Sequence, residues 1–292
     1  MSIERLQEKI RKTKNPSVME LDITRENVPP HLLLEEGTFE KAYTRFCLEL
    51  MDVLRGVIPA IKFNFAAFAL LGTEGLVTLS KVLDYGKRLG YYVILEVPES
   101  LSAQRANANA ELLFGETSLW PCDGILISAY IGSDTVKPYA ERLENTDKSL
   151  FVTVRTANRS AMELQDLLTG GRNVYDAVAD IANRFKNPKA AKTGYNRIGL
   201  LGPASSASIL HKLRQKYKYL FILADGYDYP NSNAKNCAEA FDNLGHGGAV
   251  CCGAQITAAW KIAENDGIHY LEDAKEAAER IRKNLTRYVT IL

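Results

Sequence analysis

The chain has 292 residues, of which 46% are hydrophobic and 24% charged, and its formal net charge is +1. These values are typical of a globular protein with a full hydrophobic core, and the balanced charge argues against a nucleic-acid-binding or membrane-surface protein. No apolar run approaches the roughly 20 residues of a membrane span, and the five scattered cysteines lack metal or disulfide spacing. We therefore expect a cytoplasmic protein that is neither secreted nor membrane-bound.

Short apolar runs alternate with amphipathic segments along the whole chain. The apolar runs predict eight strands, at residues 17–23, 57–65, 91–95, 124–128, 150–154, 197–201, 219–224 and 248–252. The amphipathic segments predict helices at residues 39–54, 75–89, 136–143, 174–185, 204–217 and 234–244, and an Ala-rich helix follows the third strand.

Eight strand and helix repeats favour a closed parallel (β/α)8 TIM barrel, which belongs to the α/β class. No Pro-rich, Ser-rich or low-complexity linker divides the sequence, so residues 1–292 are expected to form a single domain. A doubly wound open sheet is the alternative. It is disfavoured because no GxGxxG turn follows the first strand.

Polar residues stand within or just after several predicted strands, and a barrel would gather them at one mouth. They are Asp22, Lys62, Asn64, Glu96, Ser128, Arg155, Thr156 and Asp225. Lys62 lies inside an apolar run, AIKFNF, where a buried ammonium group needs a carboxylate partner. Asp22 or Glu96 can supply it, and the pair is either part of an active site or a structural ion pair. Ser128 is expected to be a hydrogen-bond partner rather than a nucleophile, because no histidine lies in a triad context.

Four segments together resemble orotidine 5'-phosphate decarboxylase in its long bacterial form. The opening ERLQEKIRKTKNPSVMELDITRENVPPHL is similar to that family's first helix and "GLD" strand end, and IKFNFAAFALLGTEGLVTL is similar to its "KPxxAFFExxGxxG" segment. DGILISAYIGSDTVKPYAE resembles the "SPYxGxxxxxP" loop, and LFVTVRTANRSAMELQDL resembles the "TSNP" region. The resemblance runs over nearly the whole chain.

The resemblance implies a TIM barrel that converts orotidine 5'-phosphate to UMP and CO2 in pyrimidine biosynthesis, with no metal or organic cofactor. It implies a nucleotide monophosphate ligand similar to orotidine 5'-phosphate or UMP, and a homodimer whose active site straddles the interface. It places Lys62 and Glu96 at catalytic positions. The implied substrate-binding residues are Asp22, Asn64, Ser128, Thr156, Asn158, Gly226, Gly253 and Gln255.

The sequence departs from the family where the chemistry takes place. Laid on the family's Asp-x-Lys-x-x-Asp motif, VILEVPESLSAQRA puts Glu96 at the first Asp, Pro98 at the proton-donating Lys and Leu101 at the Asp that reaches the neighbouring subunit. Removing even one preorganised donor typically costs about 3–4 kcal/mol of transition-state stabilisation. Catalysis is therefore expected to be impaired or lost, and whether the chain is an enzyme stays open.

The phosphate end of the resemblance is altered as well. Gln255 stands where the family has an Arg, and Asp225 and Asp228 are expected to repel a phosphate. The amides of Gly226 and Gly253 remain as expected donors to a ligand.

These observations leave three hypotheses. The chain is a nucleotide-binding or regulatory barrel that no longer makes UMP, or it is an active decarboxylase that recruits Glu99 or Lys62, or it is a non-catalytic subunit that pairs with an active relative. In each case we expect Glu96 to pair with Lys62.

Overall fold

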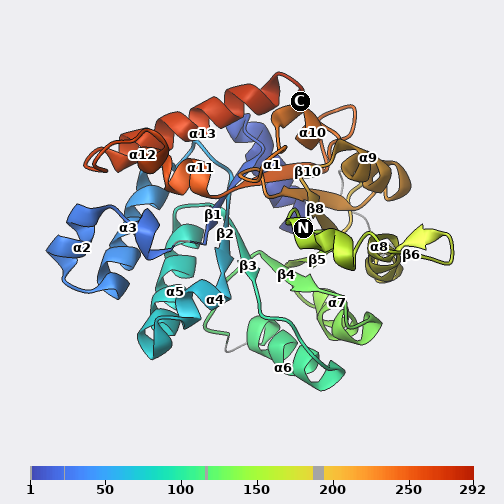
Figure 1. The fold of residues 1–292 in the computed structure, drawn as a ribbon. Helices are drawn as coiled ribbons and strands as arrows, with labels where there is room; N and C mark the ends of the chain where they lie inside the picture. The colour runs from blue at the N-terminus through green and yellow to red at the C-terminus, as the bar shows by residue number, and fades with distance from the viewer. Residues whose placement is uncertain (1, 23, 116–117, 187–193) are drawn as a thin grey trace.

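The computed structural model describes residues 2–22, 24–115, 118–186 and 194–292. Within these residues, eight parallel strands form a closed barrel at the centre of the molecule, and helices surround it (Figure 1). The strands are β1 (Ser17–Leu21), β2 (Ala60–Asn64), β3 (Tyr92–Glu96), β4 (Gly124–Ser128), β5 (Ser149–Thr153), β8 (Ile198–Pro203), β9 (Phe221–Asp225) and β10 (Gly248–Cys252). Their order around the barrel is β1-β10-β9-β8-β5-β4-β3-β2, so each strand pairs with its sequence neighbours in the barrel and β10 closes on β1. The predicted TIM-barrel fold is confirmed.

The helices follow the strands in the alternating manner of this fold. They are α1 (Ser2–Thr13), α2 (Pro30–Glu36), α3 (Phe39–Val53), α4 (Phe65–Ala69), α5 (Gly72–Arg88), α6 (Ala103–Phe114), α7 (Lys137–Leu143), α8 (Val174–Arg184), α9 (Ala207–Lys216), α10 (Ala234–Ala238), α11 (Ala254–Thr257), α12 (Ala259–Ile262) and α13 (Tyr270–Thr286). A small antiparallel hairpin, β6 (Leu168–Thr169) and β7 (Arg172–Asn173), precedes α8.

Some predicted boundaries were wrong for local reasons. The second strand begins at Ala60 rather than at residue 57, because a turn closed by Val57 N–H on the Leu54 carbonyl (2.9 Å) precedes it. The helix predicted over 234–244 ends at Ala238. Beyond it the Asp242 carboxylate accepts hydrogen bonds from the amides of Leu244 and His246, both at 2.8 Å, and these bonds fix a turn in place of helix.

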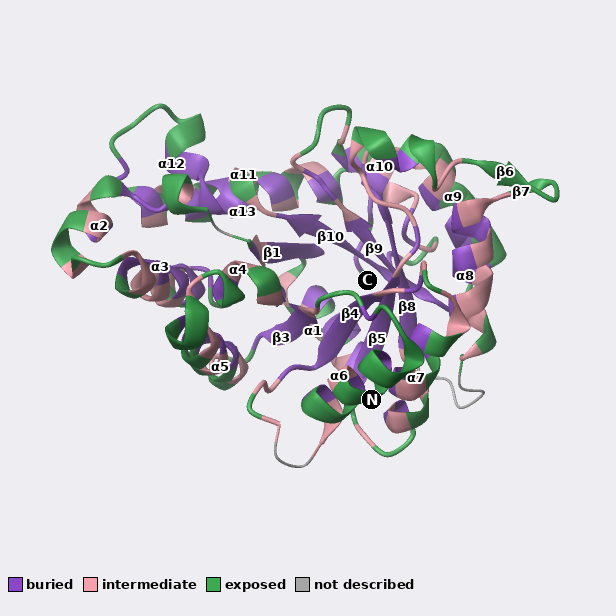
Figure 2. Ribbon diagram, turned by 60° about the horizontal axis from the view of Figure 1, so that its bottom comes forward, coloured by how far each residue is buried: buried purple, intermediate pink, exposed green. Residues whose placement is uncertain are grey.

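The strands are buried, and the helices turn buried faces toward them and exposed faces outward (Figure 2). Phe151 of β5 fills the barrel interior beside two glycines. A Cβ atom at Gly124 would lie 2.9 Å from the Phe151 ring, and one at Gly199 would lie 2.7 Å from it. The ring is accommodated because the neighbouring strands lack side chains at these points, which is the large and small complementarity of a close-packed core.

Helix α1 closes the end of the barrel at which the strands begin. The Ser2 hydroxyl donates to the carbonyl of Asp123 (2.8 Å), and the Gln7 side chain accepts from the Gly247 amide (3.0 Å). Asp123 is itself buried and paired with Arg5 (2.7 Å). With this end closed, the carboxyl ends of the strands form the accessible mouth.

No helix of the described residues combines the length and the apolar character needed to cross a membrane.

Candidate functional site

Lys62 is the centre of a charged cluster at the barrel mouth. Its ammonium group contacts the carboxylates of Glu20, Asp225 and Glu96, the last two at 3.0 and 3.2 Å. These residues come from β2, β1, β9 and β3, and Glu20 is the direct register partner of Lys62. The Lys62 side chain is only 8% exposed. The predicted pairing of Lys62 with Glu96 is present, but Glu20 and Asp225 share the ammonium, whereas Asp22 is exposed.

One ammonium group shared by three carboxylates favours protonation of the most buried acid. Burial raises the pKa of Glu20 to about 8, although the charge of Lys62 acts in the opposite direction. Burial by itself would lower the pKa of Lys62, but the charges of Asp225 and Glu20 raise it well above its usual value. The cluster near neutral pH therefore holds a charged lysine and a Glu20 that is largely protonated.

We expect Glu20→Gln to flatten the pH dependence of stability. Because the pKa of Glu20 is raised in the folded protein, its contribution to stability is full below pH 4.5 and is lost as the pH rises through about 8. Within that window each pH unit changes the free energy of unfolding by up to about 1.4 kcal/mol. Urea unfolding at pH 5, 7 and 9 measures the change, with Glu276→Gln on the exposed face of α13 as the control. Equal pH slopes for the variant and the wild type would contradict the assignment.

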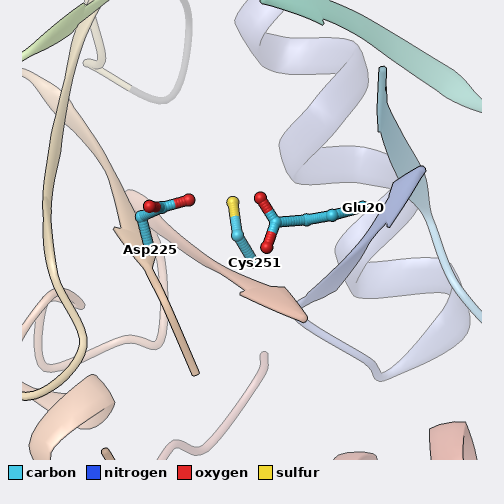
Figure 3. A group of neighbouring side chains, drawn as sticks. All are labelled: Glu20, Asp225 and Cys251. Carbon is cyan, nitrogen blue, oxygen red and sulfur yellow. The ribbon is translucent and has the colours of Figure 1, made fainter. Parts of the chain in front are cut away.

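Cys251 lies beside the same carboxylates. Figure 3 shows its sulfur between Glu20 and Asp225, and the three ligand atoms lie within 4.8 Å of one another. This spacing suits a metal ion, but the Lys62 ammonium already contacts both carboxylates. Burial also raises the pKa of the Cys251 thiol well above its usual value, which keeps it protonated and a poor ligand. The trio therefore accommodates an ammonium group rather than a metal.

A cavity of about 410 Å³ opens next to the cluster, which we call the mouth pocket. It is lined by Lys62, Glu96, Val97, Glu99, Leu126, Ile127, Ser128, Tyr130, Thr153, Thr156, Leu164, Gln165, Leu201 and Asp225. Among these residues Lys62 is the one cation, against three carboxylates. The remaining wall is neutral and partly apolar, so the mouth pocket as a whole presents negative charge.

Two of the predicted substrate-binding residues, Ser128 and Thr156, line the mouth pocket. Thr156 is held by Gln165, which accepts from the Thr156 amide (2.8 Å) and donates to its hydroxyl (2.9 Å). Arg155 turns away into a two-point ion pair with Asp166, at 2.8 and 3.2 Å. The loop after β5 therefore brings neutral hydrogen-bonding groups to the pocket, and its arginine is already neutralised.

Asn64 and Asn158 make local contacts. The Asn64 side chain accepts from the Ala66 amide (2.9 Å) and caps α4. The Asn158 side chain donates to the Ser160 hydroxyl (2.8 Å). Both residues end or follow strands as predicted, but neither belongs to the lining of the mouth pocket among the residues that the structure describes.

The turn after β10 holds an internal carboxylate. Asp228 accepts hydrogen bonds from the amides of Gly253 (2.7 Å), Ala254 (2.8 Å) and Gln255 (3.1 Å). The Gly253 amide, predicted to donate to a ligand, donates to Asp228 in this structure, and its role toward a ligand stays a prediction. The Gln255 side chain points to the Tyr227 carbonyl (3.4 Å).

The two replaced catalytic positions lie in the loop after β3. Pro98 is exposed, and the Leu101 side chain is 59% exposed. Glu99, between them in sequence, is exposed and lines the mouth pocket. This loop therefore brings an acidic group toward the pocket and no ammonium group.

Sequence reasoning missed the roles of Glu20, Asp225 and Asp228. The signal for Glu20 was present, because it is a charged residue inside the apolar run SVMEL, as Lys62 is in its own run. Asp225 and Asp228 stood in a segment where repulsion of a phosphate was expected. Their actual partners, Lys62 and the amides after β10, depend on strand register and loop path.

Comparisons with known proteins agree with the motifs. A curated orotidine 5'-phosphate decarboxylase of Rhodopirellula baltica is 29% identical over 227 residues, covering 76% of this chain and 75% of its own. One of Clostridium novyi is 27% identical over 286 residues, covering 98% of each chain. No protein-family model matches the chain.

Solved structures show the same fold. The OMP decarboxylase of Leishmania donovani has a TM-score of 0.75 at 23% identity and covers 98% of both chains. The enzyme of Methanocaldococcus jannaschii, complexed with the inhibitor BMP, has a TM-score of 0.63 at 14% identity and covers 93% of this chain and 98% of its own. At these identities the likeness concerns the barrel itself.

Proposed function

The chain is homologous to the orotidine 5'-phosphate decarboxylases, and from this relationship we propose that it is a barrel of that family which no longer decarboxylates orotidine 5'-phosphate. The observation that carries the proposal is the charge balance of the mouth pocket. Lys62 is the one cation among its lining residues, and three carboxylates already contact its ammonium group.

Loss of CO2 leaves an electron pair on the pyrimidine ring, which needs a nearby positive charge and a proton. Glu96 retains a carboxylate where the family has one, but Pro98 offers neither charge nor proton. Lys62 does not replace the missing group, because its charge is balanced within the cluster and its raised pKa makes it a weak acid. Glu99 adds a negative group, which disfavours a developing carbanion.

We expect purified protein to release CO2 from orotidine 5'-phosphate at least ~10³-fold more slowly than the Clostridium novyi homologue assayed in parallel, since one lost donor already costs about 10²–10³-fold. The double variant Pro98→Lys with Leu101→Asp is expected to remain inactive, because the phosphate end is altered as well. Wild-type turnover within about tenfold of the homologue would overturn the proposal.

The remaining features are proposed from the relationship alone. The predicted homodimer, cytoplasmic location and single-domain organisation stay predictions. The contacts of Asp228 argue against the predicted nucleotide monophosphate ligand. Its carboxylate occupies three backbone amides at the end of the barrel where a phosphate would bind.

A further inference from the structure

We propose that Asp228 determines the ligand class of the mouth pocket by filling the amides after β10, so that the barrel takes an unphosphorylated ligand. This inference rests on the proposed function, in which the barrel keeps its pocket and has lost the decarboxylation. It concerns a residue that has no part in the Lys62 cluster or in the loop after β3.

The carboxylate of Asp228 is fitted to its three donors. One oxygen accepts from Gly253 (2.7 Å) and Ala254 (2.8 Å), and the other accepts from Gln255 (3.1 Å). A Cβ atom at position 253 would lie 2.9 Å from the same Asp228 oxygen. Glycine at this position therefore permits the close approach of the carboxylate, and the three donors are satisfied without a ligand.

The turn after β9 holds Asp228 in place. Gly226 has a φ of +79°, and its carbonyl accepts from the Tyr229 amide (3.0 Å) and the Ser232 hydroxyl (2.8 Å). Tyr227, the residue before Asp228, is 7% exposed. These contacts anchor both sides of the aspartate, so a competing anion would have to displace a fixed, charge-assisted interaction.

The amides that Asp228 occupies lie where a barrel of this type often binds a phosphate group. In (β/α)8 barrels, a ligand phosphate is frequently bound by the loops after the seventh and eighth strands together with a short extra helix. Here those strands are β9 and β10, and the short helix is α11. The donors that would hold a phosphate are the ones that Asp228 occupies.

The surrounding charge acts in the same direction. Asp225 ends β9 three residues before Asp228, and a Cβ atom at Gly253 would lie 3.5 Å from the Glu20 carboxylate. A phosphate dianion at the amides would meet the negative charges of Asp228 and Asp225, and Lys62 is the one cation among the residues that line the adjoining mouth pocket. The neutral Ser128, Thr156 and Gln165 suit an uncharged polar ligand instead.

The test measures UMP, uridine and inorganic phosphate binding by calorimetry for the wild type and for Asp228→Ala. We expect the wild type to show no binding of phosphate and no preference for UMP over uridine. Asp228→Ala frees three amides and removes a negative charge. It is expected to gain at least ~10-fold in UMP affinity, the equivalent of one charge-assisted hydrogen bond, with no gain for uridine.

Asp266→Ala is the matched control, because Asp266 also accepts a backbone hydrogen bond, from Ile268 (3.0 Å), and its removal changes the net charge equally. If Asp228→Ala fails to fold, Asp228→Asn keeps the shape, removes the charge, and is expected to show a smaller gain for UMP. A wild type that binds UMP at least tenfold more tightly than uridine would overturn the inference, as would variants that gain nothing.

The outcome is separable from that of the proposed function. A tenfold preference for UMP over uridine in a wild type that releases no CO2 contradicts the role of Asp228 and leaves the loss of decarboxylation standing. CO2 release from orotidine 5'-phosphate contradicts the proposed function directly, whatever the calorimetry gives.

Discussion

Replacing Lys62 by methionine is expected to lower the free energy of unfolding at pH 7 by about 3–5 kcal/mol, the usual cost of removing one partner from a buried ion pair. Methionine conserves the volume of the side chain but removes the one charge that Glu20, Asp225 and Glu96 share. Asp225 and Glu96 then lose their counter-charge in a partly buried site, where electrostatic interactions are poorly screened.

Urea unfolding at pH 7 measures the loss. Lys137→Met is the control, because the Lys137 side chain is 63% exposed and its pair with Glu141 is on the surface, so a change of no more than about 0.5 kcal/mol is expected. A Lys62 variant as stable as this control would show that the carboxylates do not depend on the ammonium group.

Replacing Arg214 by methionine is expected to cost a similar amount, about 3–5 kcal/mol, for a different reason. Arg214 on α9 is 7% exposed, and its guanidinium donates to the carbonyls of Ala240 (2.9 and 2.8 Å), Gly247 (2.6 Å) and Leu220 (2.9 Å). It thereby fastens α9 to the segments that precede β9 and β10. Methionine removes the guanidinium donors from all three carbonyls, and the Gly247 carbonyl keeps only its bond from the Ile222 amide (2.8 Å).

The unfolding midpoint in urea measures this loss as well, and Arg280→Met on an exposed position of α13 is the matched control. Arg214→Lys keeps the charge but lacks the planar set of donors, so we expect an intermediate loss of about 2 kcal/mol. If lysine restores full stability, the charge rather than the geometry of the guanidinium group is what the fold requires.

Two charged groups at the barrel mouth, Lys62 and Asp228, have partners within the chain. Lys62 on β2 contacts Glu20 and Asp225, and Asp228 accepts from the amides after β10. Carboxylates of the chain balance the Lys62 charge, and the Asp228 carboxylate accepts from the backbone amides after β10. The described residues thus satisfy these groups of the mouth without a ligand.

The barrel fold and the resemblance to the decarboxylase family could both be inferred from the sequence alone. The alternation of apolar runs and amphipathic segments is a local property, and each run of five or so β-branched and apolar residues forms a strand wherever the next helix covers it. Motif positions such as Thr156 and Ser128 could be aligned with a family, and the structure places both beside the mouth pocket. The absence of an ammonium group at Pro98 could also be inferred from the sequence, because residue identity alone decides it.

Only the tertiary structure decided which charges meet. Glu20 and Lys62 are 42 positions apart and Lys62 and Asp225 are 163 apart, so their contacts follow from strand register and closure of the barrel. Asp228 reaches the amides after β10 because the turn at Gly226 directs it there, and its sequence alone suggested only repulsion of a phosphate. Contacts of this kind depend on the relative placement of distant segments, which no local pattern encodes.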